Sequence, residues 1–132
     1  MESINMTSSN YEFVYCIYDG TAVKIGKARD VKSRVKMLQT GNPNRLVPLF
    51  AAAFPCGMAG SVERSMLECF EDRKMVGEWL NVSPELVLKK LMVTAFSVIG
   101  TRFIAYSDEW AKRVDSAILY EKRARSGSAV DR

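Results

Sequence analysis

Blocks of apolar residues with two different periods run along this chain of 132 residues, and they predict strands first and helices later. Residues 11–18, YEFVYCIY, are aromatic, β-branched and apolar, so they predict a strand. Asp19 and Gly20 are the preferred residues of a two-residue hairpin turn, and residues 21–27 would form the returning strand. A β-hairpin is therefore expected at residues 11–27.

Asp30 can cap a helix whose apolar residues Val31, Val35 and Leu38 are spaced for one helical face. The sequence TGNPN at residues 40–44 would end this helix. The apolar segment at residues 45–54 then predicts a buried strand, which tolerates Pro48 only at a sheet edge or at a bulge.

In the second half of the chain, the apolar residues mostly recur with the period of a helix. Residues 61–73 predict a helix with an inward stripe of Val62, Met66, Cys69 and Phe70. Ser83 and Pro84 predict the start of another helix, with four residues directed toward the core: Leu86, Leu88, Leu91 and Met92. Residues 94–106 fit either a helix or a strand, and a last helix is expected from Ser107 or Asp108 to about Lys122.

This order of elements predicts the α/β (α+β) class, with a small mixed sheet flanked by helices and a helical C-terminal extension. We expect a flexible leader at residues 1–10, a core at residues 11–82, a helical extension packed on it at residues 83–124, and a disordered tail at residues 125–132.

Composition narrows the class of protein. The longest apolar stretch, at residues 46–54, is about half of what a membrane span needs, so no membrane association is expected. The three cysteines, Cys16, Cys56 and Cys69, form no CxxC pair, which favours small buried thiols in a reducing, cytoplasmic compartment. With no histidine present, acid or base chemistry would depend on Tyr, Lys, Asp or Glu. The formal charge of +4 is compatible with a polyanionic partner.

The hairpin carries the first candidate chemistry. Pairing outward from an Asp19-Gly20 turn would place Tyr15 directly opposite Lys24 on one face of the sheet. A neighbouring ammonium group would lower the pKa of Tyr15 and favour its phenolate, although an ordinary surface pair is the alternative. Gly26, inside the second strand, indicates close approach of another backbone or of a ligand.

Two more side chains lie beside inward helical stripes. Arg34 lies three residues after Val31, where a guanidinium could reach over the hairpin and bind a phosphate, or could cover apolar surface with its stem. Glu63 precedes Met66 and Phe70 on its predicted helix. It could bind Mg²⁺ as a hard oxygen ligand, or it could stabilise the helix dipole only.

Taken in order, these residues resemble a known family. The sequence FVY at residues 13–15, KIG at residues 24–26, Arg34 and then Glu63 resemble the GIY-YIG nuclease superfamily. The likeness is greatest to a branch, frequent in phage and bacterial genomes, with KIG in the second motif. Its segments LQTGNP and GEWL are present at residues 38–43 and 77–80. The resemblance covers roughly residues 13–82.

The resemblance implies a three-stranded antiparallel sheet and cleavage of DNA phosphodiester bonds with one divalent ion, Mg²⁺ or Mn²⁺. It implies four catalytic residues: Tyr15 as general base or aligner of water, Lys24 as its assistant, Arg34 as phosphate clamp and Glu63 as metal ligand. Gly26 and Trp79 would be structural parts of the motifs. Lys27, Arg29, Lys32 and Lys36 are expected to follow the nucleic-acid backbone.

The chain also departs from the family pattern. Phe13 replaces the glycine of the first motif, Lys24 replaces a tyrosine, and Leu38 stands where many members have His or Tyr. Asn81 is a candidate for the asparagine that often supports the metal site. Two functions therefore stay open: a metal-dependent DNA endonuclease, with a homodimer possible, and a weak or inactive nucleic-acid-binding adaptor on the same scaffold.

Overall fold

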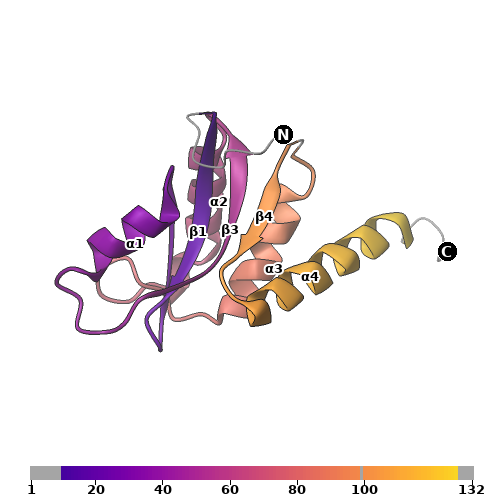
Figure 1. Ribbon diagram of the computed structural model, residues 1–132. Coiled ribbons are helices and arrows are strands. Elements are labelled where there is room, and N and C mark those ends of the chain that lie inside the picture. Colours follow the sequence, from indigo (N-terminus) through magenta and orange to yellow (C-terminus); the bar gives the residue numbers. More distant parts are fainter. Residues whose placement is uncertain (1–9, 99, 128–132) are drawn as a thin grey trace.

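The strands form a single antiparallel sheet in the order β2-β1-β3-β4 (Figure 1). The computed structural model describes residues 10–98 and 100–127. The strands are β1 (Tyr11–Tyr18), β2 (Val23–Ala28), β3 (Val47–Pro55) and β4 (Arg102–Ala105). The α+β class is confirmed. The sheet has four strands where the resemblance implied three, because part of the ambiguous segment 94–106 pairs with β3 as β4.

Helices cover both faces of the sheet. They are α1 (Val31–Gln39), α2 (Ala59–Cys69), α3 (Pro84–Ala95) and α4 (Asp108–Gly127), with a 3₁₀ turn at Glu71–Arg73 after α2. On one face, Tyr15, Ile17 and Phe13 pack against α1. On the other face, Val14, Cys16 and their neighbours form a larger core with α2, α3 and α4. Strand alternation therefore divides β1 between two apolar layers.

The hairpin differs in register from the expected one. Tyr18 pairs with Val23, so the connection contains four residues, 19–22, rather than two. The Asp19 carboxylate accepts hydrogen bonds from the amides of Thr21 (2.8 Å) and Ala22 (2.7 Å), and this side-chain turn lengthens the loop. The predicted pairing of Tyr15 with Lys24 is therefore wrong.

The new register places Tyr15 opposite Gly26 and Lys24 opposite Ile17. The shift amounts to two residues, so every side chain keeps the face that was expected for it. Tyr15 and Lys24 still share the face toward α1.

Three local predictions are confirmed. Asp30 caps α1 by accepting a hydrogen bond from the Ser33 amide (3.1 Å), and Ser83 caps α3 through the Leu86 amide (3.2 Å). Pro48 lies where the β1–β3 register shifts between Cys16 and Ile17, which is the bulge that a proline in a central strand requires.

Three side chains that were expected to be buried are exposed instead. Leu86 is 41% exposed rather than in the core, and Cys56 and Cys69 are exposed, so only Cys16 is a buried thiol. The helix expected to end at residue 73 ends at Cys69, because a 3₁₀ turn follows it.

The C-terminal helix is longer than predicted. It continues past Lys122 to Gly127, so the first residues of the expected tail are helical. The leader at residues 1–9 and the rest of the tail, residues 128–132, lie outside the described residues. Within the described residues, every helix is too short or too polar to cross a bilayer.

The two leucines near the start of α3 provide a test of the packing. Leu88 is 5% exposed and Leu86 is 41% exposed. Leu88→Ala should lower the free energy of unfolding by about 2–5 kcal/mol, because it leaves a cavity in the larger core. Leu86→Ala, the matched control on the same helix, should change it by less than ~1 kcal/mol. Urea denaturation measures both, and equal losses would contradict this packing.

Candidate functional site

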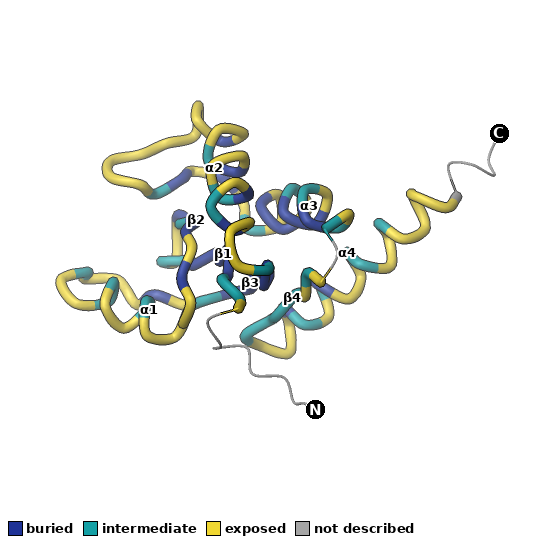
Figure 2. The backbone as a smooth tube through the Cα atoms, turned by 90° about the horizontal axis from the view of Figure 1, so that it is seen from above, coloured by how far each residue is buried: buried dark blue, intermediate teal, exposed yellow. Residues whose placement is uncertain are grey.

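A cavity of about 650 Å³ opens at the outer edge of β2, where α1 covers one face of the sheet and α2 the other. Figure 2 shows β2 between these two helices at the edge of the sheet. All four residues expected in the site line this cavity: Tyr15 from β1, Lys24 from β2, Arg34 from α1 and Glu63 from α2. Residues that are far apart in the sequence thus meet in one place.

The segment before α3 covers only the first residue of the outer edge of β2. Leu80 pairs with Val23 through two backbone hydrogen bonds of 2.8 and 3.1 Å, which cover the first residue of this edge. In the described part of the chain no strand pairs with the rest of the outer edge. Lys24, Gly26 and their neighbours consequently face a recess that a ligand can enter.

Tyr15 lies across the backbone of Gly26. Its side chain is 1% exposed, and a Cβ added to Gly26 would lie 2.3 Å from the Tyr15 hydroxyl oxygen. Only a glycine therefore allows the ring to occupy this place. Gly26 indeed marks a close approach, but the approaching group is the phenol of the neighbouring strand.

The pKa of Tyr15 is raised above its ordinary value of 10.0. Burial is the largest cause, since it disfavours the phenolate, and the charges of Glu63 and Glu78 act in the same direction. The Arg34 guanidinium opposes them as a hydrogen-bond donor and as a positive charge. At neutral pH Tyr15 is thus a neutral phenol, and the expected phenolate favoured by Lys24 is wrong.

Lys24 has a different partner. Its Nζ lies 2.6 Å from Oε1 of Glu78, and the side chain of Lys24 is only 13% exposed. This contact lowers the pKa of the Glu78 carboxyl, first through the hydrogen bond and then through the charge of Lys24. Lys24 is thereby held in place at the cavity wall.

Arg34 and Glu63 complete the cavity. An Nη of Arg34 donates a hydrogen bond to the backbone oxygen of Lys27 (3.4 Å), which leaves donors of the guanidinium free. Glu63 is half-buried, and its carboxylate makes no hydrogen bond or ion pair with another side chain of the described ranges. The cavity therefore combines an available cation with an available carboxylate.

The four cations that were expected to contact the nucleic-acid backbone fall into two pairs. Lys27 and Arg29 line the cavity, and Nζ of Lys27 lies 3.5 Å from a carboxylate oxygen of Glu12. Lys32 and Lys36 are exposed on α1 and lie outside the cavity lining.

Two further acids line the cavity, and one of them, Glu12, was missed in the sequence. Glu12 stands out only as an acid within an otherwise apolar strand, and Glu78 lies in the GEWL segment, where a structural role was expected. Trp79 is half-buried against the α1-side core. Leu38 lines the cavity, whereas Asn81 does not, and its backbone is hydrogen-bonded to Arg73.

The acids of the cavity fit a divalent ion that takes most of its ligands from water and substrate. Within residues 10–98 and 100–127, no three His, Cys, Asp or Glu side chains cluster as a complete metal site. Mg²⁺, however, is commonly bound through one or two carboxylates, with water and substrate phosphate as the other ligands. Glu63, a carboxylate without a cation partner among the described residues, fits that mode of binding.

Comparison with known proteins gives one match. The model of the T5orf172 domain matches residues 12–94, a range that contains all four cavity residues. This domain is found in phage and bacterial homing-endonuclease-like proteins and is related to GIY-YIG-like nucleases. No curated protein and no solved structure matches the chain.

Substitution of Gly26 tests the contact with Tyr15. Gly26→Ala should lower the free energy of unfolding by about 1–3 kcal/mol, because the new methyl group overlaps the phenol ring. Gly60→Ala is the matched control: its Cβ would meet only Cε of Lys27 at 4.0 Å, and the alanine favours helix α2 by roughly 0.5–1 kcal/mol. Urea denaturation should show opposite signs, and a Gly26→Ala protein as stable as the original would contradict the contact.

The titration of Tyr15 tests the electrostatics. The phenolate absorbance lost in Tyr15→Phe should have a midpoint above pH 10.0 in the folded protein. Glu63→Gln should lower this midpoint and Arg34→Gln should raise it further, since those charges act in opposite directions. The unfolded chain loses this proton first, so stability should fall as pH rises above 10, and less so in Tyr15→Phe. A midpoint below 10 would refute the account.

Proposed function

We propose that this chain is a metal-dependent DNA endonuclease that hydrolyses phosphodiester bonds in the cavity beside β2. The chain belongs to the T5orf172 domain family, and this membership is the starting point of the proposal. The observation that carries the proposal is the meeting of Tyr15, Lys24, Arg34 and Glu63 in that one cavity. Family membership alone supports only a nuclease-like DNA-binding module.

The charges of the cavity support a phosphodiester substrate. Lys24 is neutralised by Glu78, and Lys27 is partly neutralised by Glu12. Arg34 and Arg29 then supply the positive charge available to a phosphate, while Glu63 supplies the negative charge available to a metal ion. A phosphate bound together with a divalent cation needs both signs in one place.

Hydrolysis of a phosphodiester breaks a phosphorus–oxygen bond while a water molecule adds to phosphorus. Arg34 would donate parallel hydrogen bonds to phosphate oxygens, which gain charge in the transition state. Tyr15 keeps its proton at neutral pH, which favours the second of its two expected roles, the alignment of water, over that of general base. Lys24, held by Glu78, would add a hydrogen-bond donor at a fixed position.

Glu63 would hold the divalent ion, Mg²⁺ or Mn²⁺, with waters and substrate oxygens as its other ligands. When bound, such an ion supplies Lewis-acid activation of water and neutralises charge on the phosphate. The exposed cations Arg29, Lys32 and Lys36 would contact the DNA backbone on either side of the reacting phosphate, with an affinity that falls as salt rises.

The free thiols support a cytoplasmic setting. Cys16, Cys56 and Cys69 are unpaired, and the last two are exposed. Exposed thiols persist in reducing compartments, which suits a protein that acts on DNA inside the cell.

A second function stays in competition: binding of nucleic acid without cleavage. Two observations favour it. The pKa of Tyr15 is raised rather than lowered, and Lys24 is engaged with Glu78, so neither group is poised to take a proton from water.

A cleavage assay separates the two functions. Plasmid and single-stranded DNA are incubated with the protein in Mg²⁺, in Mn²⁺ or in chelator. We expect cutting only with metal, and a rate lowered by roughly 10²–10³-fold in Arg34→Ala, which removes donors to the transition state. Glu63→Ala should abolish metal-dependent cutting.

Matched controls lie on α2. Arg64→Ala and Glu68→Ala change exposed residues of the same types outside the cavity, and both should cut at the original rate. DNA binding measured by fluorescence anisotropy without cutting, and unchanged by Glu63→Ala, would instead establish the binding module.

A further inference from the structure

The longest helix of the protein lies beyond the family domain. The match ends at residue 94, whereas α4 spans Asp108–Gly127 and contains 20 residues. At about 1.5 Å per residue it is roughly 30 Å long. Its C-terminal part extends away from the sheet (Figure 1). The cavity beside β2 contains no residue of α4, so the site described above does not explain this helix.

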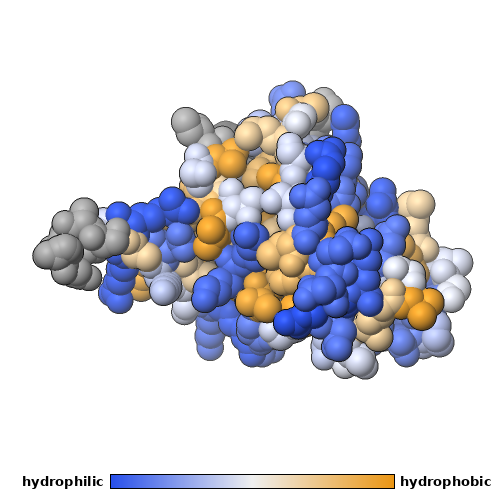
Figure 3. All heavy atoms as spheres, turned by 180° about the vertical axis from the view of Figure 1, so that it is seen from behind, coloured by the Kyte–Doolittle hydropathy of each residue, from blue (hydrophilic) through white to orange (hydrophobic). Residues whose placement is uncertain are grey.

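A second cavity, of about 640 Å³, lies between α3 and α4. Much of its lining is apolar: Leu88, Met92, Val93, Ala117, Tyr120 and Ala124. Tyr120 is 60% exposed and Val93 is 44% exposed. Seen from behind, apolar surface is visible where α4 begins to extend away from the rest of the protein (Figure 3). We call this cavity the α3–α4 groove.

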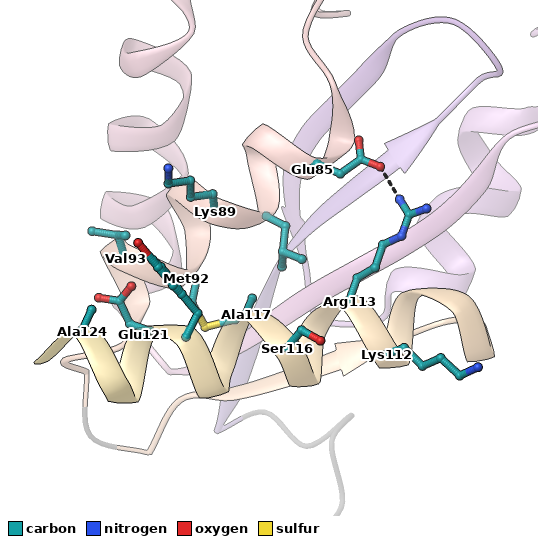
Figure 4. Close-up of a pocket in the computed structure, with 12 residues that line it drawn as sticks. Glu85, Lys89, Met92, Val93, Lys112, Arg113, Ser116, Ala117, Glu121 and Ala124 are labelled. Carbon is teal, nitrogen blue, oxygen red and sulfur yellow. Dashed lines mark hydrogen bonds and ion pairs between the residues drawn. The ribbon is translucent and has the colours of Figure 1, made fainter. Parts of the chain in front are cut away.

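Contacts at each end of the groove connect α4 to α3 or to the residue that follows α3. Arg113 of α4 forms an ion pair with Glu85 at the start of α3 (Figure 4). It also bonds Glu109 at 2.5 Å and lies over the Trp110 ring. At the other end, Arg125 lies 5.0 Å over the Phe96 ring and pairs with Glu121 at 2.9 Å. A groove fixed in this way can accept a partner at a low cost in conformational entropy.

The side of α4 that lines the groove is complementary to itself. If two α4 helices pack antiparallel with the two-fold axis between Ser116 and Ala117, Lys112 lies at the level of the partner's Glu121, whose carboxylate also pairs with Arg125 of its own helix. Arg113 then lies at the level of the partner's Tyr120. Each pair occurs twice, because a two-fold interface repeats every contact.

The types of residue suit this register. The small residues Ser116 and Ala117 at the centre allow the two helices to approach closely. An arginine favours the face of an aromatic ring, and lysine attracts glutamate. Antiparallel packing also opposes the dipoles of the two helices and brings the acidic first turn, Asp108 and Glu109, toward the basic residues near the other C-terminus.

We propose that the α3–α4 groove is the surface through which two copies of this chain form an antiparallel, two-fold dimer. The two α3–α4 pairs would pack face to face as a bundle of four helices. The mixed charge of the lining, which contains Glu85 and Glu121 beside Lys89 and Lys112, disfavours a nucleic acid as occupant. Dimerisation would bring two β2 cavities into one particle.

A charge exchange tests the proposed register. Sedimentation velocity over a range of concentrations measures the dimer dissociation constant for the original chain, Lys112→Glu, Glu121→Lys and the double variant. Each single change places like charges together twice, so we expect dissociation constants at least about tenfold higher. The double variant should return to within about threefold of the original value. Residues 112 and 121 are nine positions apart on one helix, too far for mutual contact, so rescue must act between chains.

Arg64→Glu, on exposed α2, is the matched change of charge away from the groove and should leave the dimer intact. Circular dichroism of each variant confirms folding. A chain that is monomeric at every concentration, a dimer that both single variants leave unchanged, or a double variant without rescue would overturn the proposal. So would a monomer whose affinity for DNA is altered by Lys112→Glu, since the groove would then be a nucleic-acid surface.

Discussion

The packing of the Tyr15 ring over the bare backbone of Gly26 is the constraint on which the candidate site depends. The ring is excluded from solvent, and its hydroxyl is held where it meets the Arg34 guanidinium and senses the charges of Glu63 and Glu78. The same burial that fixes the group also holds its proton. Precise placement and easy deprotonation therefore oppose each other, and in the protein without ligand placement prevails.

Charge pairing then decides what the cavity can attract. Lys24 and Lys27 would make it strongly cationic if Glu78 and Glu12 did not accompany them. The Lys24 pair is the more consequential, because its lysine is almost buried and would otherwise be desolvated without compensation. The Lys27 pair is more exposed and longer, and such pairs contribute little stability. What is left are two anion-binding groups, Arg34 and Arg29, and one cation-binding group, Glu63, in the lining of one cavity.

The sequence was sufficient to predict features that depend on residues close together along the chain. Strand alternation predicted that Tyr15 and Lys24 share a face, and Asp30 and Ser83 predicted helix starts. Pro48 predicted either a sheet edge or a bulge, and the structure has the bulge. The predicted hairpin register was wrong because the Asp19 carboxylate organises a longer loop through the Thr21 and Ala22 amides. The partner of Glu78 could not be predicted because Lys24 lies 54 residues away in the sequence. β4 is only four residues long and pairs with a distant strand, so its period could not be distinguished from that of a helix.

The backbone link between Val23 and Leu80 has a consequence for how a substrate could be admitted. The segment that carries Glu78 joins the sheet by one rung, so it cannot swing outward without breaking two hydrogen bonds in an otherwise dry part of the fold. One wall of the recess is therefore rigid, unlike the mobile lids that close over many ligands. Under the proposed function, a nucleic-acid strand would have to fit its own backbone to this recess, so its shape would be selected before its bases are recognised.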